Sequence, residues 1–237
     1  MSQGSSLLEA VGLTKSYGSF RCLAHVSVVF GADAGLVVLT GENGSGKTTL
    51  ANLICGLAKP DHGRICFRGH DGTHKGFRWF TSMGMVRTFQ EPRAFEQMSV
   101  EDCLLFAVRS RSTPGIGGCL LRSGQYREAE EAAHRSSEAW LMEAGWTDRR
   151  DTLAGELSYG QRKLLTLLMA VASSSQFLVL DEPTAGLDMR QTLLGVSLLQ
   201  RWIGDGSGRA GLVITHEPEV FRSIASRWLR LSNGTLV

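Results

Sequence analysis

The sequence has little of what marks several other classes of protein, beginning with cysteine. Its five cysteines are scattered along the chain, are odd in number, and are never spaced C-x-x-C. We therefore expect reduced, mostly buried thiols in a cytosolic protein. The residues concerned are Cys22, Cys55, Cys66, Cys103 and Cys119.

Long apolar segments are also absent. The longest mostly apolar stretch, residues 164–172, is far shorter than the roughly 20 residues that a membrane-spanning helix needs. The first residues contain no apolar core of the kind that a secretion signal requires. If a protein with this sequence works at a membrane, a partner has to supply the spanning helices.

The balance of charge does not indicate a partner. The 25 Lys and Arg residues nearly match the 23 Asp and Glu residues, and the net charge of +2 argues neither for nor against nucleic acid. Five of the basic residues are lysines, so a lysine placed in a glycine-rich loop is a notable feature. A chain of 237 residues without internal repeats suits one domain, or a core domain with a subdomain.

That lysine, Lys47, lies in a loop of the form G-x-x-x-x-G-K-[ST], between a strand-like run at 36–40 and a helical run at 48–57. Glycines let successive backbone N–H groups point at phosphate oxygens, and the helix directs its positive N-terminal end to the same anion. We expect Lys47 to reach the β- and γ-phosphates and the Thr48 hydroxyl to bind Mg²⁺. The predicted nucleotide-binding residues of this segment are Gly41, Glu42, Asn43, Gly44, Ser45, Gly46, Lys47, Thr48 and Thr49.

Around this loop the pattern is that of a parallel α/β core split by a helical insertion. Apolar and β-branched runs predict strands at 7–14, 22–30, 36–40, 63–69, 83–89, 177–180, 212–215, 228–231 and 235–237. Residues 92–172 are mostly helical in pattern, with a break at 112–118 and a strongly helical composition at 125–144. An amphipathic helix is predicted at 189–203, a glycine-rich loop at 204–211, and a hairpin turn at Asn233-Gly234.

The apolar run at 177–180 ends in two acids, Asp181 and Glu182. A fully apolar strand suits the middle of a parallel sheet, and ligands of open α/β sheets bind beyond the carboxyl ends of the strands. We expect Asp181 to emerge beside the phosphate loop and help hold Mg²⁺. Glu182 is expected to face the γ-phosphate and polarise an attacking water. Without a phosphate loop upstream, the same pair would fit an ordinary strand end equally well.

Residues 157–161 read Leu-Ser-Tyr-Gly-Gln ahead of a helix, and Ser158 with Gln161 fits a capping box. The segment is either a helix cap alone, or a helix end that also offers donors to a second phosphate group, with Gly160 permitting close approach. Together with the phosphate loop, it resembles the L-S-G-G-Q signature of the ATP-binding subunits of ABC transporters, with Tyr159 in place of the first glycine.

The resemblance covers nearly the whole chain and implies roles for further residues. Tyr17 matches the aromatic residue that stacks on adenine in this family, although a strand-edge tyrosine would look the same. Gln90 is similar to the Q-loop glutamine that contacts Mg²⁺ and water, and His216 to the switch histidine that reads the γ-phosphate. Residues 182–188 resemble the catalytic acid and the D-loop. The implied catalytic residues are Glu182, His216, Lys47 and Gln90, and the implied Mg²⁺ ligands are Thr48, Gln90 and Asp181.

The fold that the resemblance implies is α/β: a P-loop NTPase core with a mixed or parallel sheet, an antiparallel β subdomain and an inserted α-helical subdomain. Residues 1–237 would form one nucleotide-binding domain, with the core and β subdomain at about 1–91 and 173–237 and the helical subdomain at about 92–172. The implied activity is hydrolysis of ATP to ADP and phosphate, with ATP and Mg²⁺ as cofactors. The implied partner is a second ABC ATPase subunit, in a homo- or heterodimer, whose Ser158, Gly160 and Gln161 cover the ATP held by the first.

Spacing narrows the choice within this family. One phosphate loop and one signature argue against the soluble translation-type members, which carry two cassettes. The short interval between Lys47 and Ser158 leaves no room for the coiled coil of the DNA-repair relatives, so no nucleic-acid partner is expected. The segment 86–102 is similar to that of ATPases serving importers of branched-chain amino acids, urea and amides.

This narrower resemblance implies two integral membrane permease subunits, a periplasmic or extracellular solute-binding protein, and a peripheral location at the cytoplasmic face of the membrane. Phe95 and Met98 are expected either in a groove that receives a short helix of the membrane subunit or in the subdomain core. The motor of an ABC exporter and a non-transport regulatory ABC ATPase remain alternatives.

Overall fold

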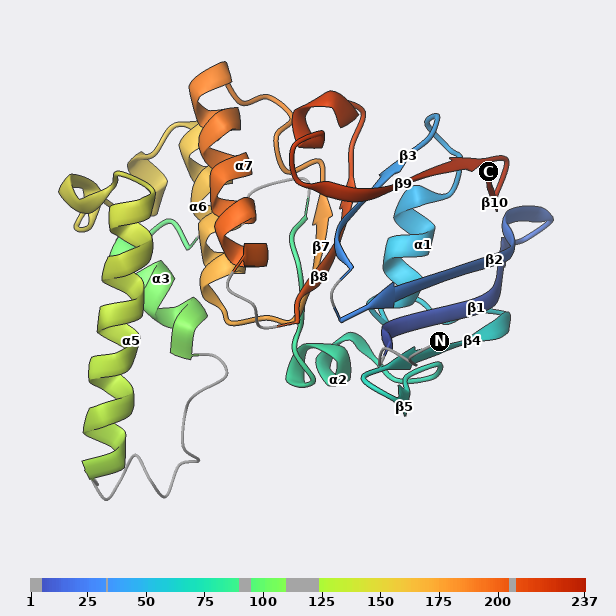
Figure 1. Ribbon diagram of the computed structural model, residues 1–237, viewed down its shortest axis with the longest axis horizontal. Helices are drawn as coiled ribbons and strands as arrows, with labels where there is room; N and C mark the ends of the chain where they lie inside the picture. Colours follow the sequence, from blue (N-terminus) through green and yellow to red (C-terminus); the bar gives the residue numbers. More distant parts are fainter. Residues whose placement is uncertain (1–5, 33, 90–94, 110–123, 205–207) are drawn as a thin grey trace. The chain divides into compact units, whose positions relative to one another are not determined.

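A computed structural model describes residues 6–32, 34–89, 95–109, 124–204 and 208–237 (Figure 1). The chain divides into two compact units. The first contains Met1–Gln90, Gln176–Ala185 and Leu199–Val237, and the second contains Glu91–Ser175 and Gly186–Leu198. Strands dominate the first unit and helices the second, and the predicted α/β fold class is confirmed.

The first unit is built on a six-stranded sheet. Along the chain its strands are β3 (Gly35–Thr40), β6 (Met85–Arg87), β7 (Phe177–Asp181), β8 (Ala210–Ile214), β9 (Ala225–Ser232) and β10 (Thr235–Leu236). In the sheet their order is β10-β9-β3-β8-β7-β6, parallel from β9 to β6, with β10 antiparallel to β9. The apolar side chains of β3, β8 and β7 are buried on both faces, as the centre of a parallel sheet requires.

A four-stranded antiparallel sheet lies in the same unit. Its strands are β1 (Ser6–Tyr17), β2 (Phe20–Gly31), β4 (His62–Phe67) and β5 (His70–Asp71), in the order β2-β1-β4-β5. β1 and β2 pair along most of their length, so both are longer than the strands predicted at 7–14 and 22–30. At the hairpin end this pairing sets Tyr17 opposite Phe20.

Two short helices, α1 (Lys47–Ile54) and α2 (Phe77–Ser82), accompany these sheets. α1 ends before the predicted residue 57 because the N–H groups of Leu57 and Ala58 both turn back to the Asn52 carbonyl. The sequence pattern does not indicate α2 or β5, since elements this short carry too little periodicity. Met83 caps α2, so β6 is shorter than the strand predicted at 83–89.

The hairpin turn predicted at Asn233-Gly234 is confirmed. The two residues have φ values of 46° and 74°, the left-handed pair that a type I′ turn requires. The turn joins β9 to β10, where Ser232 pairs with Thr235. Local sequence was therefore sufficient to identify this edge of the sheet.

In the described part of the chain, the second unit is helical. Its helices are α3 (Val100–Arg109), α5 (Gly124–Glu143), α6 (Tyr159–Ala172) and the first turns of α7 (Met189–Gly204). α3 packs against both α5 and α6 with a buried apolar face. The break predicted at 112–118 lies outside the described residues. None of the helices in the described ranges is both long enough and apolar enough to cross a membrane.

The described cysteines are free thiols. Cys22, Cys55 and Cys103 are buried and Cys66 is half-buried. Cys119 lies outside the described residues. The expectation that the thiols are mostly buried is confirmed for these four cysteines.

Aromatic side chains join the two sheets of the first unit. Phe177 of β7 is fully buried, and its ring meets the ring of Phe30 of β2 edge to face, with the centroids 5.0 Å apart and an interplanar angle of 86°. Its other aromatic neighbour is Phe67 of β4, at 6.2 Å and 77°. Such pairs add to the hydrophobic gain from burying the rings. β7, the strand that ends in Asp181, is thus held by pairing within its own sheet and by two rings of the four-stranded sheet.

We predict that Phe177→Ala lowers the free energy of unfolding by about 3–5 kcal/mol, because it removes a buried ring and leaves a cavity between the sheets. Chemical denaturation of the two proteins measures the difference. The matched control is Phe20→Ala, whose side chain is 61% exposed; we expect a change within about 0.5 kcal/mol. Equal losses for the two variants would contradict this account of the core.

Candidate functional site

The predicted phosphate loop joins β3 to α1, and its glycines are required by close approaches of the backbone. Gly41 has φ 153°, and a Cβ there would lie 2.3 Å from the Leu231 carbonyl oxygen. Gly46 has φ 105°, and a Cβ there would lie 2.8 Å from the Cys22 carbonyl oxygen. A side chain at either position would collide with neighbouring backbone, so the curled conformation of the loop requires glycine at both.

Lys47 is the first residue of α1 and is folded back over the loop. Its ammonium donates hydrogen bonds to the carbonyl oxygens of Gly41 at 2.6 Å and Glu42 at 2.9 Å. Burial lowers the pKa of Lys47, and the nearby carboxylates of Glu182 and Asp181 oppose that shift. A cation is therefore held between the loop and two acids.

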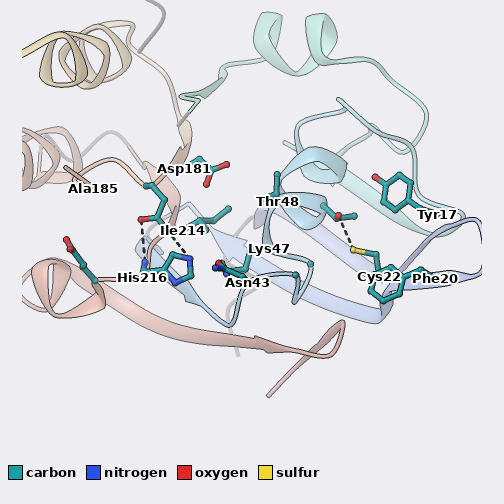
Figure 2. Close-up of a pocket in the computed structure, with 15 residues that line it drawn as sticks. Tyr17, Phe20, Cys22, Asn43, Lys47, Thr48, Asp181, Ala185, Ile214 and His216 are labelled. Carbon is teal, nitrogen blue, oxygen red and sulfur yellow. Dashed lines mark hydrogen bonds and ion pairs between the residues drawn. The ribbon is translucent and has the colours of Figure 1, made fainter. Parts of the chain in front are cut away.

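A cavity of about 530 Å³ opens beside this loop, and its lining comes entirely from the first unit (Figure 2). Tyr17, Phe20 and Cys22 lie at one end, and Asp181 and His216 lie at the other. The residues that line the cavity are Tyr17, Phe20, Cys22, Asn43, Gly44, Gly46, Lys47, Thr48, Thr49, Asp181, Glu182, Ala185, Ile214, His216 and Glu217.

Most of the residues predicted to bind nucleotide from this unit meet at the cavity, with exceptions on the loop. Gly41, Glu42 and Ser45 belong to the loop but are outside the lining. The Ser45 hydroxyl is buried and has no hydrogen-bond partner among the described residues. Thr49 lines the cavity, and its hydroxyl lies 3.1 Å from the Cys22 thiol.

The two acids at the end of β7 have different surroundings. Asp181 pairs with Ile214 in the parallel register of β7 and β8, and it lines the cavity. Glu182 follows in a left-handed conformation with φ 48°, and its N–H donates to the Ile214 carbonyl at 2.9 Å. A glutamate with positive φ is strained, and such strain concentrates at functional sites. Glu182 lines the cavity together with Asp181.

Glu182 and His216 both line the cavity and contact each other there. The His216 backbone N–H donates to Glu182 Oε2 at 3.4 Å, and the ring nitrogen Nε2 lies 3.6 Å from Oε1 (Figure 2). Glu182 is buried, whereas the side chain of His216 is 52% exposed. The histidine can therefore reach a ligand in the cavity while its backbone orients the acid.

Oxygen donors at the cavity suit Mg²⁺. The Thr48 hydroxyl and the Asp181 carboxylate both line it, and Mg²⁺ prefers such ligands with the remainder supplied by phosphate and water. Within the described residues, no cluster of three or more His, Cys, Asp or Glu side chains could hold a metal ion by itself. Gln90, the third predicted ligand, lies outside the described residues. The donors present fit a nucleotide-bound Mg²⁺ ion.

The signature segment belongs to the second unit. The capping box at the start of α6 is confirmed: Ser158 Oγ accepts from the Gln161 N–H at 3.3 Å, and Gln161 Oε1 accepts from the Ser158 N–H at 2.9 Å. Gly160 is packed closely, because a Cβ there would lie 2.4 Å from Gln191 Oε1. Gln191 itself bonds with Asp188 ahead of α7, so two capped helix ends meet at this glycine.

Sequence reasoning missed several residues at or near the cavity, among them Phe20, Cys22, Ile214, Glu217 and Arg87. Phe20 and Cys22 line it, and the register of β1 with β2 could have suggested Phe20, since it faces Tyr17 across the hairpin. Arg87 lies beside Asp181, with Nη2 3.4 Å from Oδ2. No local pattern indicated that this arginine would be buried.

Comparison with known proteins agrees with this geometry. The family model described as ABC transporter matches residues 27–185. The high-affinity branched-chain amino acid transport ATP-binding protein LivG of Salmonella typhimurium is 30% identical over 229 residues, 97% of this chain and 89% of that protein. The sulfate/thiosulfate import ATP-binding protein CysA of Methylococcus capsulatus is 33% identical over 233 residues, 97% of this chain and 61% of that protein.

A solved structure of the ADP conformation of an ATP-binding cassette of an ABC transporter has a TM-score of 0.80 to this chain at 28% identity, covering 98% of this chain and 89% of that one. The family model spans more than half of the chain, and the relatives span nearly all of it. Within the first unit, the loop lysine, the two acids and the histidine share one cavity. The chain belongs to the ABC transporter family and is an ATPase.

Proposed function

We propose that this protein is the ATP-binding and ATP-hydrolysing subunit that energises a membrane importer of branched-chain amino acids or a related small polar solute. The observation that carries the hydrolytic part is the Glu182–His216 contact at a cavity that Lys47 and Asp181 also line. An acid, a histidine, a lysine and a metal-binding carboxylate are the groups that phosphoryl transfer to water uses.

Each group has a distinct task in this proposal. Lys47 and the loop N–H groups bind the phosphates, and Thr48 with Asp181 holds Mg²⁺, which neutralises charge that develops on them. Glu182 orients and polarises the attacking water, and His216 contacts the γ-phosphate. Tyr17 stacks on the base at the opposite end of the cavity. Gln90 is proposed as a further ligand of the metal and its water.

Completion of the site needs a second subunit. The family resemblance assigns Ser158, Gly160 and Gln161 to the ATP held by a second copy of the chain. The start of α6 has what binds an anion, a helix N-terminus and a serine hydroxyl. We therefore propose an ATP-dependent dimer in which α6 of one copy covers the γ-phosphate bound by the other.

An exposed aromatic pair supports a membrane-subunit contact. The ring of Phe95, which precedes α3, meets the ring of Phe106 on α3 edge to face, with the centroids 5.2 Å apart. The two residues are nevertheless 47% and 53% exposed. Their exposure favours the first of the two expectations for Phe95, a site for a short helix of a permease. Two permease subunits would hold the protein at the cytoplasmic face of the membrane, and a solute-binding protein would deliver the cargo.

The relatives differ in the solutes that their names state. LivG is named for branched-chain amino acids and CysA for sulfate and thiosulfate. We favour the amino-acid class because the segment around Arg87 is similar to that of such importers. Reconstitution with the permeases encoded beside this gene, followed by uptake of labelled leucine and of labelled sulfate, distinguishes the two. Outward transport would instead support the exporter alternative.

We predict that Glu182→Gln lowers the ATPase rate at least about 100-fold, because the amide cannot accept a proton from water. ATP binding remains, so the variant accumulates as an ATP-bound dimer on size-exclusion chromatography. Glu217→Gln is the matched control, since Glu217 also lines the cavity, and its rate stays near that of the wild type. Intact turnover in Glu182→Gln would rule out our choice of the base.

A second prediction tests whether two copies share a site. Lys47→Ala and Ser158→Glu each abolish activity alone. Mixed in equal amounts, they form heterodimers that contain one intact pair of loop and signature, and about a quarter of wild-type ATPase activity returns. A mixture as inactive as its parts, with dimer exchange verified, would show that each chain works by itself.

A third prediction concerns the aromatic pair. Phe95→Asp places a charge on the proposed permease contact, so co-purification with the membrane subunits and solute uptake are lost while the ATPase of the free protein is kept. Met142→Asp is the control, because Met142 is 66% exposed on α5 and should retain both. If Phe95→Asp unfolds the protein, the ring belongs to the core of its unit instead.

A further inference from the structure

We propose that Arg87 is a positioning residue that holds the Asp181 carboxylate in place for Mg²⁺, so that Mg²⁺-dependent nucleotide binding depends on a side chain outside the cavity lining. The inference rests on the proposed function of Asp181 as a metal ligand. The ATPase activity by itself does not explain why this charged side chain is buried. Arg87 ends β6, and its side chain is 2% exposed.

A buried guanidinium is costly unless its charge and its donors are matched. Nη1 donates to Asn52 Oδ1 of α1 at 2.6 Å, and Nη2 donates to Asp181 Oδ2 of β7 at 3.4 Å. The guanidinium also lies 5.4 Å from the centroid of the Phe89 ring. Arg87 therefore connects its own strand to the helix that follows the phosphate loop and to the strand that carries the metal ligand.

The charge partner of this arginine is Asp181 rather than the other polar neighbours. The Asn52 amide is neutral, and burial raises the pKa of the Cys55 thiol, which also bonds Arg87, to about 12. Among the described residues, Arg87 Nε is buried without a hydrogen-bond partner. Because an apolar side chain of similar volume could fill this space at a lower cost in free energy, we interpret the buried cation as a sign of a role.

The two main bonds of Arg87 differ in strength, and the difference suits positioning. The hydrogen bond to Asn52 is short, with 2.6 Å between donor and acceptor. The donor–acceptor distance to Asp181, 3.4 Å, is near the limit for a hydrogen bond. Asn52 thus anchors the guanidinium, which then orients Asp181 through Oδ2. Oδ1 remains as the oxygen for a cation, and the carboxylate can still adjust when one binds. Groups that orient a metal ligand in this way commonly control metal affinity.

If Arg87 positions Asp181, its removal weakens Mg²⁺ binding; charge repulsion alone predicts the opposite. Arg87 and Mg²⁺ are both positive and would lie beside one carboxylate, so removing the arginine would strengthen Mg²⁺ binding if repulsion were its main effect. Loss of orientation would weaken it. The sign of the change therefore decides between the two effects.

The experiment measures binding of a fluorescent ATP analogue to the full chain, in Mg²⁺ and in EDTA, for Arg87→Met and Arg87→Lys. Methionine fills the buried space without a charge, and lysine keeps the charge without the fork. We expect Arg87→Met to weaken binding in Mg²⁺ by about 10- to 100-fold and to leave binding in EDTA unchanged. Arg87→Lys should recover part of the loss. Arg68→Met is the control, because Arg68 is exposed and its side chain is described with one hydrogen bond, from Nη1 to the Met83 carbonyl at 3.1 Å.

A double-mutant cycle completes the test. If Arg87 acts through Asp181, then Arg87→Met causes no further loss in an Asp181→Asn background. Stronger Mg²⁺-dependent binding, equal losses in Mg²⁺ and EDTA, or a full effect in the Asp181→Asn background would each overturn the proposal. Should Asp181→Asn itself leave the Mg²⁺ dependence intact, the metal assignment in the proposed function fails instead.

Discussion

The parallel register of β3, β8 and β7 is the constraint on which the site depends. Leu39 of β3 and Asp181 of β7 both pair with Ile214 of β8, so the three strands end at the same level. Beyond those ends come the phosphate loop, Glu182 and His216, which are far apart in the sequence. A shift of register by one residue would turn the side chains of a strand to the other face and separate these groups. The aromatic contacts of Phe177 help to prevent such a shift.

The site also holds opposed charges at short range. Lys47 loses solvation in the loop and is partly compensated by Asp181 and Glu182. Glu182 is buried, strained at φ 48° and oriented by the backbone of His216. Such an arrangement is preorganised, because the groups that meet a nucleotide are held in place by contacts made before it binds.

Each of the two units also contains a polar side chain that supports a residue with a proposed role. Arg87 links α1 to Asp181, and Gln191 packs on Gly160 at the joined starts of α6 and α7. Both contacts place a polar side chain against a residue with a proposed role in ATP binding. Changes in such side chains would alter how the site is positioned rather than which groups it contains.

The sequence alone predicted the motifs whose hydrogen bonds or backbone conformations involve only neighbouring residues. The phosphate loop, the Ser158–Gln161 capping box and the Asn233-Gly234 turn each close their own hydrogen bonds or conformations locally, so their residue types identify them. The apolar run before Asp181 likewise indicated a central parallel strand, which the sheet confirms. The short elements α2 and β5 were not predicted, because they contain too few residues to show a hydrophobic periodicity.

The tertiary structure alone decided which distant side chains meet. The pairing of β1 with β2 brings Phe20 and Cys22 to the cavity, and the alignment of β6 with β7 sets Arg87 beside Asp181. Nothing near Arg87 in the chain shows that its partners will be Asn52 and Asp181, because those contacts arise from strand register and helix packing. The sequence by itself thus determined the chemical groups and their local geometry, while the folded chain determined their neighbours, since only long-range pairing brings residues so far apart within bonding distance.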